Sequence, residues 1–325
     1  MTTGAQVIRA ADFSRLDWQL YAENPVLGPP PRSPIMADPS FLPAQDCPDG
    51  QMHLFAHALQ GIFHYTSGDG VHFKRQGRVV PHAMRPYLFR HGGQYHLVYE
   101  KIRRFHLYLG WLPIRWRSQI ELRSSDDLFS WSKPTVLLKP TLDWHRDSRY
   151  GESVSNPCLL PTNDGFLLFY SANLVHLDDC GFNEPKYFGL ARARELHGPY
   201  ETLSEPIMAP DQSDPLLNMG CGSLKAMPSD NGFVGMMNSI YRDGEGRSRS
   251  AILGVASADG VHWERTAREP LIAPSEEYPW MRSHVYAFDF RRDDQAGKWR
   301  MYFNARNDWH WSKGSEYIGL AEAAL

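Results

Sequence analysis

A short pattern returns five times along this chain of 325 residues, and it restricts the possible folds more than any single residue does. Each copy begins with an apolar strand that opens on a small or proline-containing turn. A second strand rich in aromatic residues follows, and the copy ends with an alternating strand and a polar turn. The five openings are Ala37-Asp38-Pro39-Ser40-Phe41, Met84-Arg85-Pro86-Tyr87-Leu88, Ser155-Asn156-Pro157-Cys158-Leu159, Cys221-Gly222-Ser223-Leu224 and His284-Val285-Tyr286-Ala287-Phe288.

Four strands repeated at a period of roughly 45 to 75 residues are typical of the blade of a β-propeller. The second strands are expected at residues 52–57, 95–100, 166–172, 233–240 and 299–306. The fifth copy stops after residues 317–321 and lacks a fourth strand, but residues 17–20 and 24–27 have the form of one. The sequence therefore predicts an all-β, five-bladed β-propeller in which the N-terminal strand completes the last blade and closes the ring, leaving no free sheet edges there.

The repeat covers nearly the whole chain, so we expect a single domain over residues 1–325. The predicted blades are residues 34–82, 83–141, 150–209, 218–273, and 280–325 together with 15–28.

Composition restricts the partners and the compartment. The net charge is −3 with mixed signs, which does not favour nucleic-acid or membrane binding. The first residues have no signal-peptide pattern and no apolar run reaches the length of a spanning helix, so we expect a cytoplasmic protein. The four widely spaced cysteines suit free thiols better than a zinc site or disulfides. No motif for a cofactor or a resident metal is found.

Strand direction predicts which face carries function. The start of strand 1, the end of strand 2 and the start of strand 3 lie on one face of an antiparallel blade. The loops that join strands 2 and 3 open onto this face, and those at residues 101–117, 174–185 and 307–312 are longer than a hairpin requires. The first of them contains Trp111. Such loops could line a pocket, and the first could also form a homodimer interface. The residues expected around the axis are Asp38, Arg85, Ser155, Asn156, Gly222 and His284, with His57, Glu100, Asn173, Tyr241 and Arg306 from the second strands.

Several of these segments resemble glycoside hydrolase family 43 and its five-bladed relatives, families 32, 62, 68, 117 and 130. The segment 37–41 resembles their first-blade signature, and residues 282–285 and 297–306 resemble their fifth blade. The segments 169–172, 189–191 and 198–200 resemble the third blade. The resemblance covers most of the chain.

The resemblance implies a carbohydrate-active enzyme with a catalytic base in blade 1, an orienting Asp in blade 2 and a general acid Glu in blade 3. Asp38 matches the base, although an Asp-Pro pair can also simply start a turn. The other two positions depart from the pattern: blade 2 has Arg85-Pro86-Tyr87 and blade 3 has Ser155-Asn156-Pro157. Two of the three usual carboxyls are therefore not at their expected positions.

Nearby residues could replace them. Glu152 lies just before the blade 3 strand and could act as the acid, or it could be a surface residue. Glu100 is more easily read as an ion-pair partner of Arg85, because a neighbouring arginine lowers a carboxyl pKa and an acid catalyst needs it raised. His284 could contact the substrate, transfer protons or lie near a structural calcium ion, or be a buried hydrogen-bonded side chain. The other residues expected to bind substrate are Arg85, Tyr87, Glu100, Trp111, Asn156, Arg282 and Arg306.

The leading hypothesis is a glycoside hydrolase-like enzyme that cleaves a glycosidic bond, with Asp38 as base, Glu152 as acid and His284 assisting. Its partner would be a small-molecule or oligosaccharide substrate. A second hypothesis is a diverged propeller enzyme, a lyase, cyclase or transferase, acting on a charged or non-carbohydrate metabolite. A third is a propeller that binds sugar without catalysis.

Overall fold

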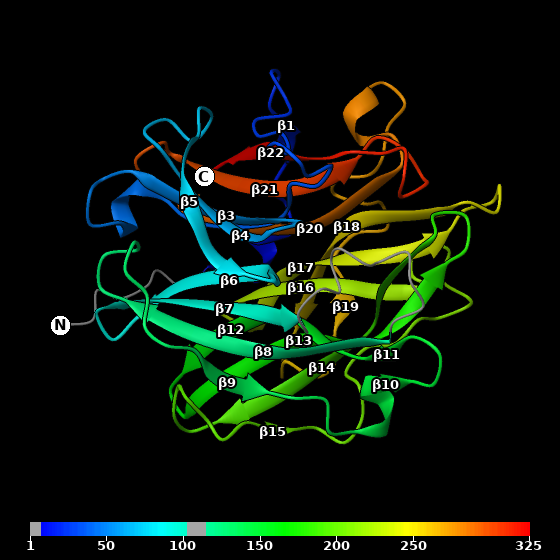
Figure 1. The fold of residues 1–325 in the computed structure, drawn as a ribbon, viewed down its shortest axis with the longest axis horizontal. Coiled ribbons are helices and arrows are strands. Elements are labelled where there is room, and N and C mark those ends of the chain that lie inside the picture. Colours follow the sequence, from blue (N-terminus) through cyan, green and yellow to red (C-terminus); the bar gives the residue numbers. More distant parts are fainter. Residues whose placement is uncertain (1–7, 103–114) are drawn as a thin grey trace.

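The structure is a computed structural model that describes residues 8–102 and 115–325. Within these ranges the strands form five antiparallel sheets arranged around a central axis as the blades of a propeller (Figure 1). The first strands of neighbouring blades contact one another around this axis. The predicted five-bladed propeller is confirmed.

Each blade runs through its strands in chain order, starting from the innermost strand. Blade 1 consists of β2 (Ala37–Leu42), β3 (Met52–Ala58), β4 (Gly61–Ser67) and β5 (Lys74–Pro81). Blade 2 consists of β6 (Ala83–His91), β7 (Gln94–Ile102), β8 (Trp116–Ser125) and β9 (Thr135–Leu138), with the short strands β10 (Arg146–Asp147) and β11 (Gly151–Glu152) attached to β8. Blade 3 consists of β12 (Val154–Thr162), β13 (Gly165–Leu177), β14 (Phe182–Ala193) and β15 (Glu201–Thr202).

Blade 4 and blade 5 follow the same plan. Blade 4 consists of β16 (Gly220–Ser229), β17 (Gly232–Arg242), β18 (Ser248–Ser257) and β19 (Glu264–Arg265). Blade 5 consists of β20 (His284–Asp293), β21 (Lys298–Arg306), β22 (Glu316–Ala324) and β1 (Gln19–Leu20). The helical segments are α1 (Ala10–Phe13) and the 3-10 turns at Ala44–Asp46, Asp143–His145 and Pro279–Met281. Among the described residues, none of these helices is long and apolar enough to cross a membrane.

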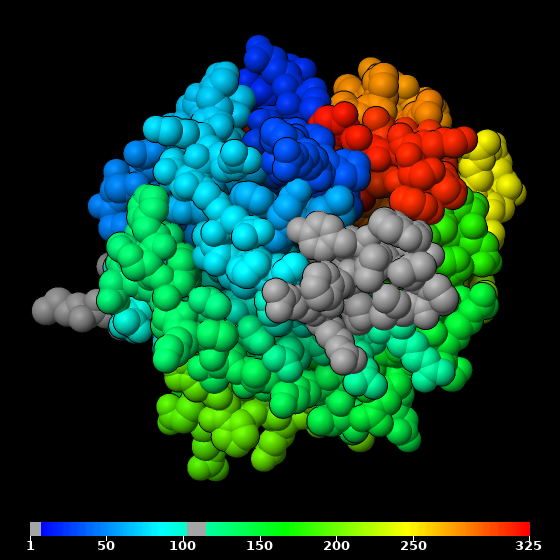
Figure 2. Space-filling model, in the orientation of Figure 1, coloured from blue at the N-terminus to red at the C-terminus, as the bar shows by residue number. Residues whose placement is uncertain are grey.

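The two ends of the chain close the ring together, as predicted. β1 pairs with β22, and Leu27 forms a further bridge to Ile318. Asn24 ties the two segments side by side, because its amide donates to the carbonyl of Leu320 and accepts from the Leu320 N–H, both at 2.8 Å. Figure 2 shows the N-terminal segment in blue adjoining the C-terminal segment in red on the surface.

The repeated polar turn after the third strand is structural. In blade 1, Asp69 Oδ1 accepts the N–H groups of Val71 and His72 at 2.8 Å, and in blade 4 Asp259 accepts the corresponding pair at the same distance. Such bonds satisfy backbone donors that the end of the strand leaves free. The turn explains the Ser-x-Asp-Gly repeat without assigning it a role in function.

A β-bulge interrupts the first strand of every blade at the same level. Two residues of the inner strand there face one residue of the second strand. The first bulged residues are Asp38, Arg85, Asn156, Gly222 and Tyr286. Three of them have positive φ, at 50° for Asp38, 55° for Arg85 and 46° for Asn156. Non-glycine residues rarely adopt this conformation, and it marks places where the fold over-determines the direction of a side chain.

The blade 3 hairpin differs from the expected loop over residues 174–185. β13 continues to Leu177 and β14 already begins at Phe182, so most of this segment is regular antiparallel sheet. The register pairs Val175 with Glu184 and His176 with Asn183. A turn around Gly181, with φ of 75°, joins the two strands. The extension carries a carboxyl group toward the axis that a loop would not have placed there.

All four cysteines are free thiols, as expected, and three of them are buried. The interior consists of aromatic and aliphatic side chains packed between adjacent blades. Phe41, Phe169 and Phe288 are fully buried representatives. Each such side chain contributes about 1.5–3 kcal/mol by leaving water, so the blades hold one another rigidly around the axis.

Candidate active site

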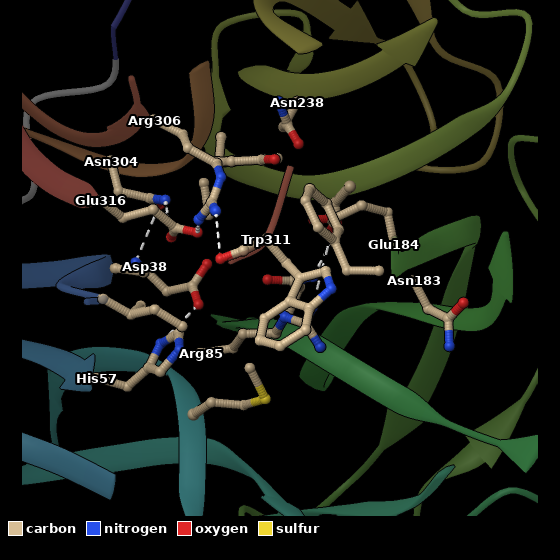
Figure 3. A pocket seen from close by; sticks show the side chains of 18 of the residues that line it. Asp38, His57, Arg85, Asn183, Glu184, Asn238, Asn304, Arg306, Trp311 and Glu316 are labelled. Atoms are coloured by element: carbon tan, nitrogen blue, oxygen red, sulfur yellow. Dashed lines mark hydrogen bonds and ion pairs between the residues drawn. The ribbon is translucent and has the colours of Figure 1, made fainter. Parts of the chain in front are cut away.

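A cavity of about 300 Å³ opens at the axis on the face predicted to carry function. Such a volume lies at the lower end of the range for small-molecule sites. All five first bulged residues line it, so the bulges are the device that aims one residue from each blade at a common space. In Figure 3, Asp38 and His57 enter from one side of the cavity and Asn183 and Glu184 from the other.

Asp38 is held by two contacts. Its Oδ2 lies 2.8 Å from Nδ1 of His57, and its backbone N–H donates to Oδ1 of Asn304 at 3.0 Å. Burial would raise the pKa of Asp38, but His57, together with the Arg85 and Lys225 cations, lowers that pKa below its usual value. Asp38 is therefore ionised at neutral pH and suited to accept a proton.

Arg85 lies beside Asp38 at the bulge of blade 2. Its Nη1 is 2.6 Å from Oε2 of Glu100, which is fully buried and also accepts from Nε1 of Trp116 at 3.0 Å. Burial disfavours the cation, yet Glu100, Asp38 and Glu184 together raise the pKa of Arg85. Glu100 is thus an ion-pair partner of Arg85.

Glu184 faces the cavity from β14, and sequence reasoning missed it. Its nearest cation is Arg85, whose Nη2 is 4.0 Å from Oε2 of Glu184, a longer contact than the one that Arg85 makes with Glu100. Burial, reinforced by the negative charges of Glu316 and Asp38, raises the pKa of Glu184 to about 8. Glu184 therefore retains its proton at neutral pH and can donate it.

A third carboxyl, Glu316, begins β22 at the edge of the same cavity. Its Oε1 pairs with Nη1 of Arg306 at 3.0 Å and its Oε2 accepts from Asn304 at 3.2 Å. Burial raises the pKa of Glu316, and Arg306 opposes that shift. Arg306 also donates to the carbonyls of Asp308, His310 and Trp311, so it shapes the blade 5 loop as well as lining the cavity.

His284 is not among the described residues that line the cavity, although the sequence had placed it there. It pairs with Arg306 two positions before Tyr286, which takes the bulge in blade 5. The His284 side chain is fully buried, its Nε2 lies 3.7 Å from Sγ of Cys180, and its ring stacks on Tyr286. Burial lowers the pKa of His284 to about 3, so the ring is neutral. A thiol and aromatic rings do not suit calcium, which prefers oxygen ligands.

Glu152 is likewise outside the cavity as far as the described residues show. Its carboxylate lies in β11, 3.3 Å from Nε of Arg146 and 3.8 Å from Nε of Arg117, and its side chain is 33% exposed. Two nearby arginines and access to water favour an ionised carboxylate, whereas an acid catalyst must hold its proton.

The remaining predicted residues divide between the cavity and the core. Asn156 lines the cavity and donates to the carbonyl of Gly222 at 2.6 Å. Tyr87 is buried below the cavity, where the cations of Lys225 and Arg291 lie 4.8 and 5.2 Å from its ring centroid. Arg282 lies beside the blade 5 loop and donates to the carbonyl of Asn307 at 2.7 Å. Trp111 and most of the blade 2 insertion lie outside the described residues, so the predicted homodimer contact stays a prediction.

Weak signals for the missed residues were present in the sequence. Residues 182–188 alternate in polarity before the third strand of blade 3, which favours an earlier start for that strand. His57 ends the second strand of blade 1 on the predicted face, one position from the level of Asp38. Trp311, which also lines the cavity, lies in a loop already predicted to open there.

Comparisons with solved structures agree on the fold. The neighbours are five-bladed propeller glycoside hydrolases at low sequence identity. An α-L-arabinofuranosidase from Podospora anserina superposes with a TM-score of 0.62 at 13% identity, covering 96% of this chain and 98% of that one. A structure described for the GH130 family of mannoside phosphorylases and hydrolases has a TM-score of 0.62 at 13% identity, covering 95% and 96%. An N-acetylgalactosamine deacetylase from F. plautii has a TM-score of 0.60 at 14% identity, covering 95% and 94%.

No family model matches the chain, and the search of curated proteins found no match. At these identities the likeness shows the fold alone.

Proposed function

We propose that this protein is a glycoside hydrolase in which Asp38 acts as the base and Glu184 as the general acid. The observation that carries the proposal is one cavity holding two carboxyls whose pKa values are shifted in opposite directions, down for Asp38 and to about 8 for Glu184. Such a pair is the signature of an acid and a base serving one reaction. The solved structures of similar fold include several glycoside hydrolases, which supports this reaction class.

Each residue then has a chemical task. Asp38, kept ionised by His57 and Arg85, would take a proton from the attacking water. Glu184 would protonate the oxygen of the leaving sugar as the glycosidic bond breaks. Arg85, within electrostatic reach of both carboxyls, would keep Asp38 charged without ionising Glu184, because its closest partner is Glu100. Water attack opposite the leaving group would invert the anomeric centre.

The charges of the cavity favour a neutral sugar. The two arginines among its described lining residues, Arg85 and Arg306, are each paired with a buried or half-buried glutamate. Neither is left to bind a carboxylate or phosphate on the ligand. This arrangement gives less support to the alternative of a lyase, cyclase or transferase acting on a charged metabolite.

The test is hydrolysis of a panel of aryl glycosides and oligosaccharides containing arabinose, xylose, fructose, mannose or galactose. We expect turnover of at least one member, a loss of about 10²-fold or more in Asp38→Asn, and inversion in the first product seen by proton NMR. Asp178→Asn is the matched control, because Asp178 is 83% exposed.

Two results would favour the rival functions. Sugar binding without turnover, unchanged in Asp38→Asn, would indicate a sugar-binding propeller. Inertness toward every glycoside, with thermal stabilisation by charged metabolites, would indicate the diverged enzyme.

A further inference from the structure

We propose that Trp311 is the stacking platform for the sugar on the leaving-group side of the scissile bond, an inference that rests on the proposed function. It assigns the substrate class as an oligosaccharide of at least two neutral sugar rings, one in the axial cavity and the next against the Trp311 indole.

The blade 5 loop contains two tryptophans with contrasting surroundings. Trp309 is fully engaged: its Nε1 donates to the carbonyl of Ser248 at 3.2 Å, and the guanidiniums of Arg247 and Arg249 lie 4.7 and 4.9 Å from its ring centroid. Trp311 lines the cavity, yet it is 44% exposed. Few large apolar side chains among the described residues are exposed to this degree.

The backbone of Trp311 is held from both sides. Its N–H donates to the carbonyl of Cys180 at 2.9 Å, and its carbonyl accepts from Arg306 at 2.9 Å. These bonds fasten the blade 5 loop to the tip of the blade 3 hairpin that carries Glu184. The ring position is therefore coupled to the element that supplies the proposed acid.

One edge of the ring rests on a glycine that no other residue could replace without movement. A Cβ at Gly181 would come within 2.8 Å of Cδ1 of Trp311, and the φ of 75° at this position also favours glycine. The ring is thus supported from below by backbone and open above. Figure 3 shows the indole between Asp38 and Glu184, facing the cavity.

A flat apolar ring held at this position offers a sugar what the rest of the site lacks. The other described side chains that face Asp38 and Glu184 are mainly polar, and they suit hydroxyl groups. The face of a sugar ring carries C–H groups, and covering it with an indole removes apolar surface from both. Because Glu184 protonates the leaving oxygen, a ring beside the Glu184 hairpin would carry the leaving sugar.

The experiment measures binding by calorimetry in the Asp38→Asn background, with two probes: the disaccharide and the methyl glycoside of whichever sugar the panel identifies. We expect Trp311→Leu to weaken disaccharide binding by about tenfold, or about 1.4 kcal/mol, and to leave methyl glycoside binding within about twofold. Trp311→Phe should retain most of the affinity, because it keeps a flat ring. Phe129→Ala is the matched control, since Phe129 is 50% exposed and lies outside the described cavity lining.

The outcomes separate the two proposals. Equal disaccharide affinity in Trp311→Leu and its parent would overturn the platform and leave the hydrolase intact. An equal loss for both probes would also overturn it, because the cavity itself would then be damaged. No binding of either sugar to any variant would overturn the proposed function.

Discussion

Two glutamates near blade 3 show what the tertiary environment does to one chemical group. Glu152 lies in β11 between Arg146 and Arg117 and has access to water. Glu184 lies in β14, is buried at the axial cavity and has Arg85 no closer than 4.0 Å. Burial without a close counter-charge lets a carboxyl keep its proton, whereas an exposed site between two cations does not. Proximity in sequence to the family's expected position is therefore a poor guide to the acid.

The largest expected difference between the two glutamates is in catalysis. Glu184→Gln should lower kcat by about 10²–10⁴-fold on substrates with poor leaving groups, because no proton is delivered to the departing oxygen. Glu152→Gln should change kcat by no more than about twofold. The measurement is kcat for a natural disaccharide and for an aryl glycoside with a good leaving group, on which Glu184→Gln should be far less impaired. Equal losses in the two variants would contradict the assignment.

The ion pairs of the two regions should differ next in stability. Arg85→Met leaves Glu100 fully buried without its counter-charge and should cost about 3–5 kcal/mol of unfolding free energy. Arg146→Met removes one partner of the exposed Glu152 and should cost less than about 1 kcal/mol. Urea unfolding compares the two. The double variant Arg85→Met/Glu100→Gln should recover part of the loss, and failure to do so would mean that Arg85 acts through packing.

The pH dependence of turnover tests which carboxyl holds the proton. The acid must be protonated to work, so kcat/KM should fall above a pH of about 8 as Glu184 ionises, by about tenfold per pH unit. The Glu152→Gln variant should keep this basic limb. A limb that persists unchanged in Glu184→Gln, measured on the aryl glycoside, would assign it to another group.

A smaller effect should appear in stability against pH. The folded-state pKa of Glu184 is above its unfolded value, so the folded protein binds this proton more tightly and loses stability as pH rises from about 4.5 to about 8. Glu184→Gln removes this loss, by at most about 1.4 kcal/mol per pH unit. Thermal unfolding should show the variant gaining on the parent across this interval and remaining parallel to it above pH 9. Parallel curves throughout would show that Glu184 ionises freely.

The inner strands illustrate how far the repeat pattern reaches. Asp38, Arg85 and Asn156 each precede a proline at the same place in their copies, and the structure places all three at bulges around the cavity. Blade 5 has no proline to mark the bulge. The histidine that opens its strand was therefore aligned with Asp38, whereas Tyr286 takes that place and His284 is turned into the core.

The sequence by itself determined the number of blades, the closure of the ring by the N-terminal strand, the face that carries the cavity and the position of Asp38. These depend on local patterns of alternating polarity, turn residues and proline, which repeat and can be counted. Only the tertiary structure decided that Glu184, His57, Glu316 and Trp311 share a cavity with Asp38. Their roles depend on burial and on distances between blades far apart in the chain, and such quantities exist only once the ring has closed.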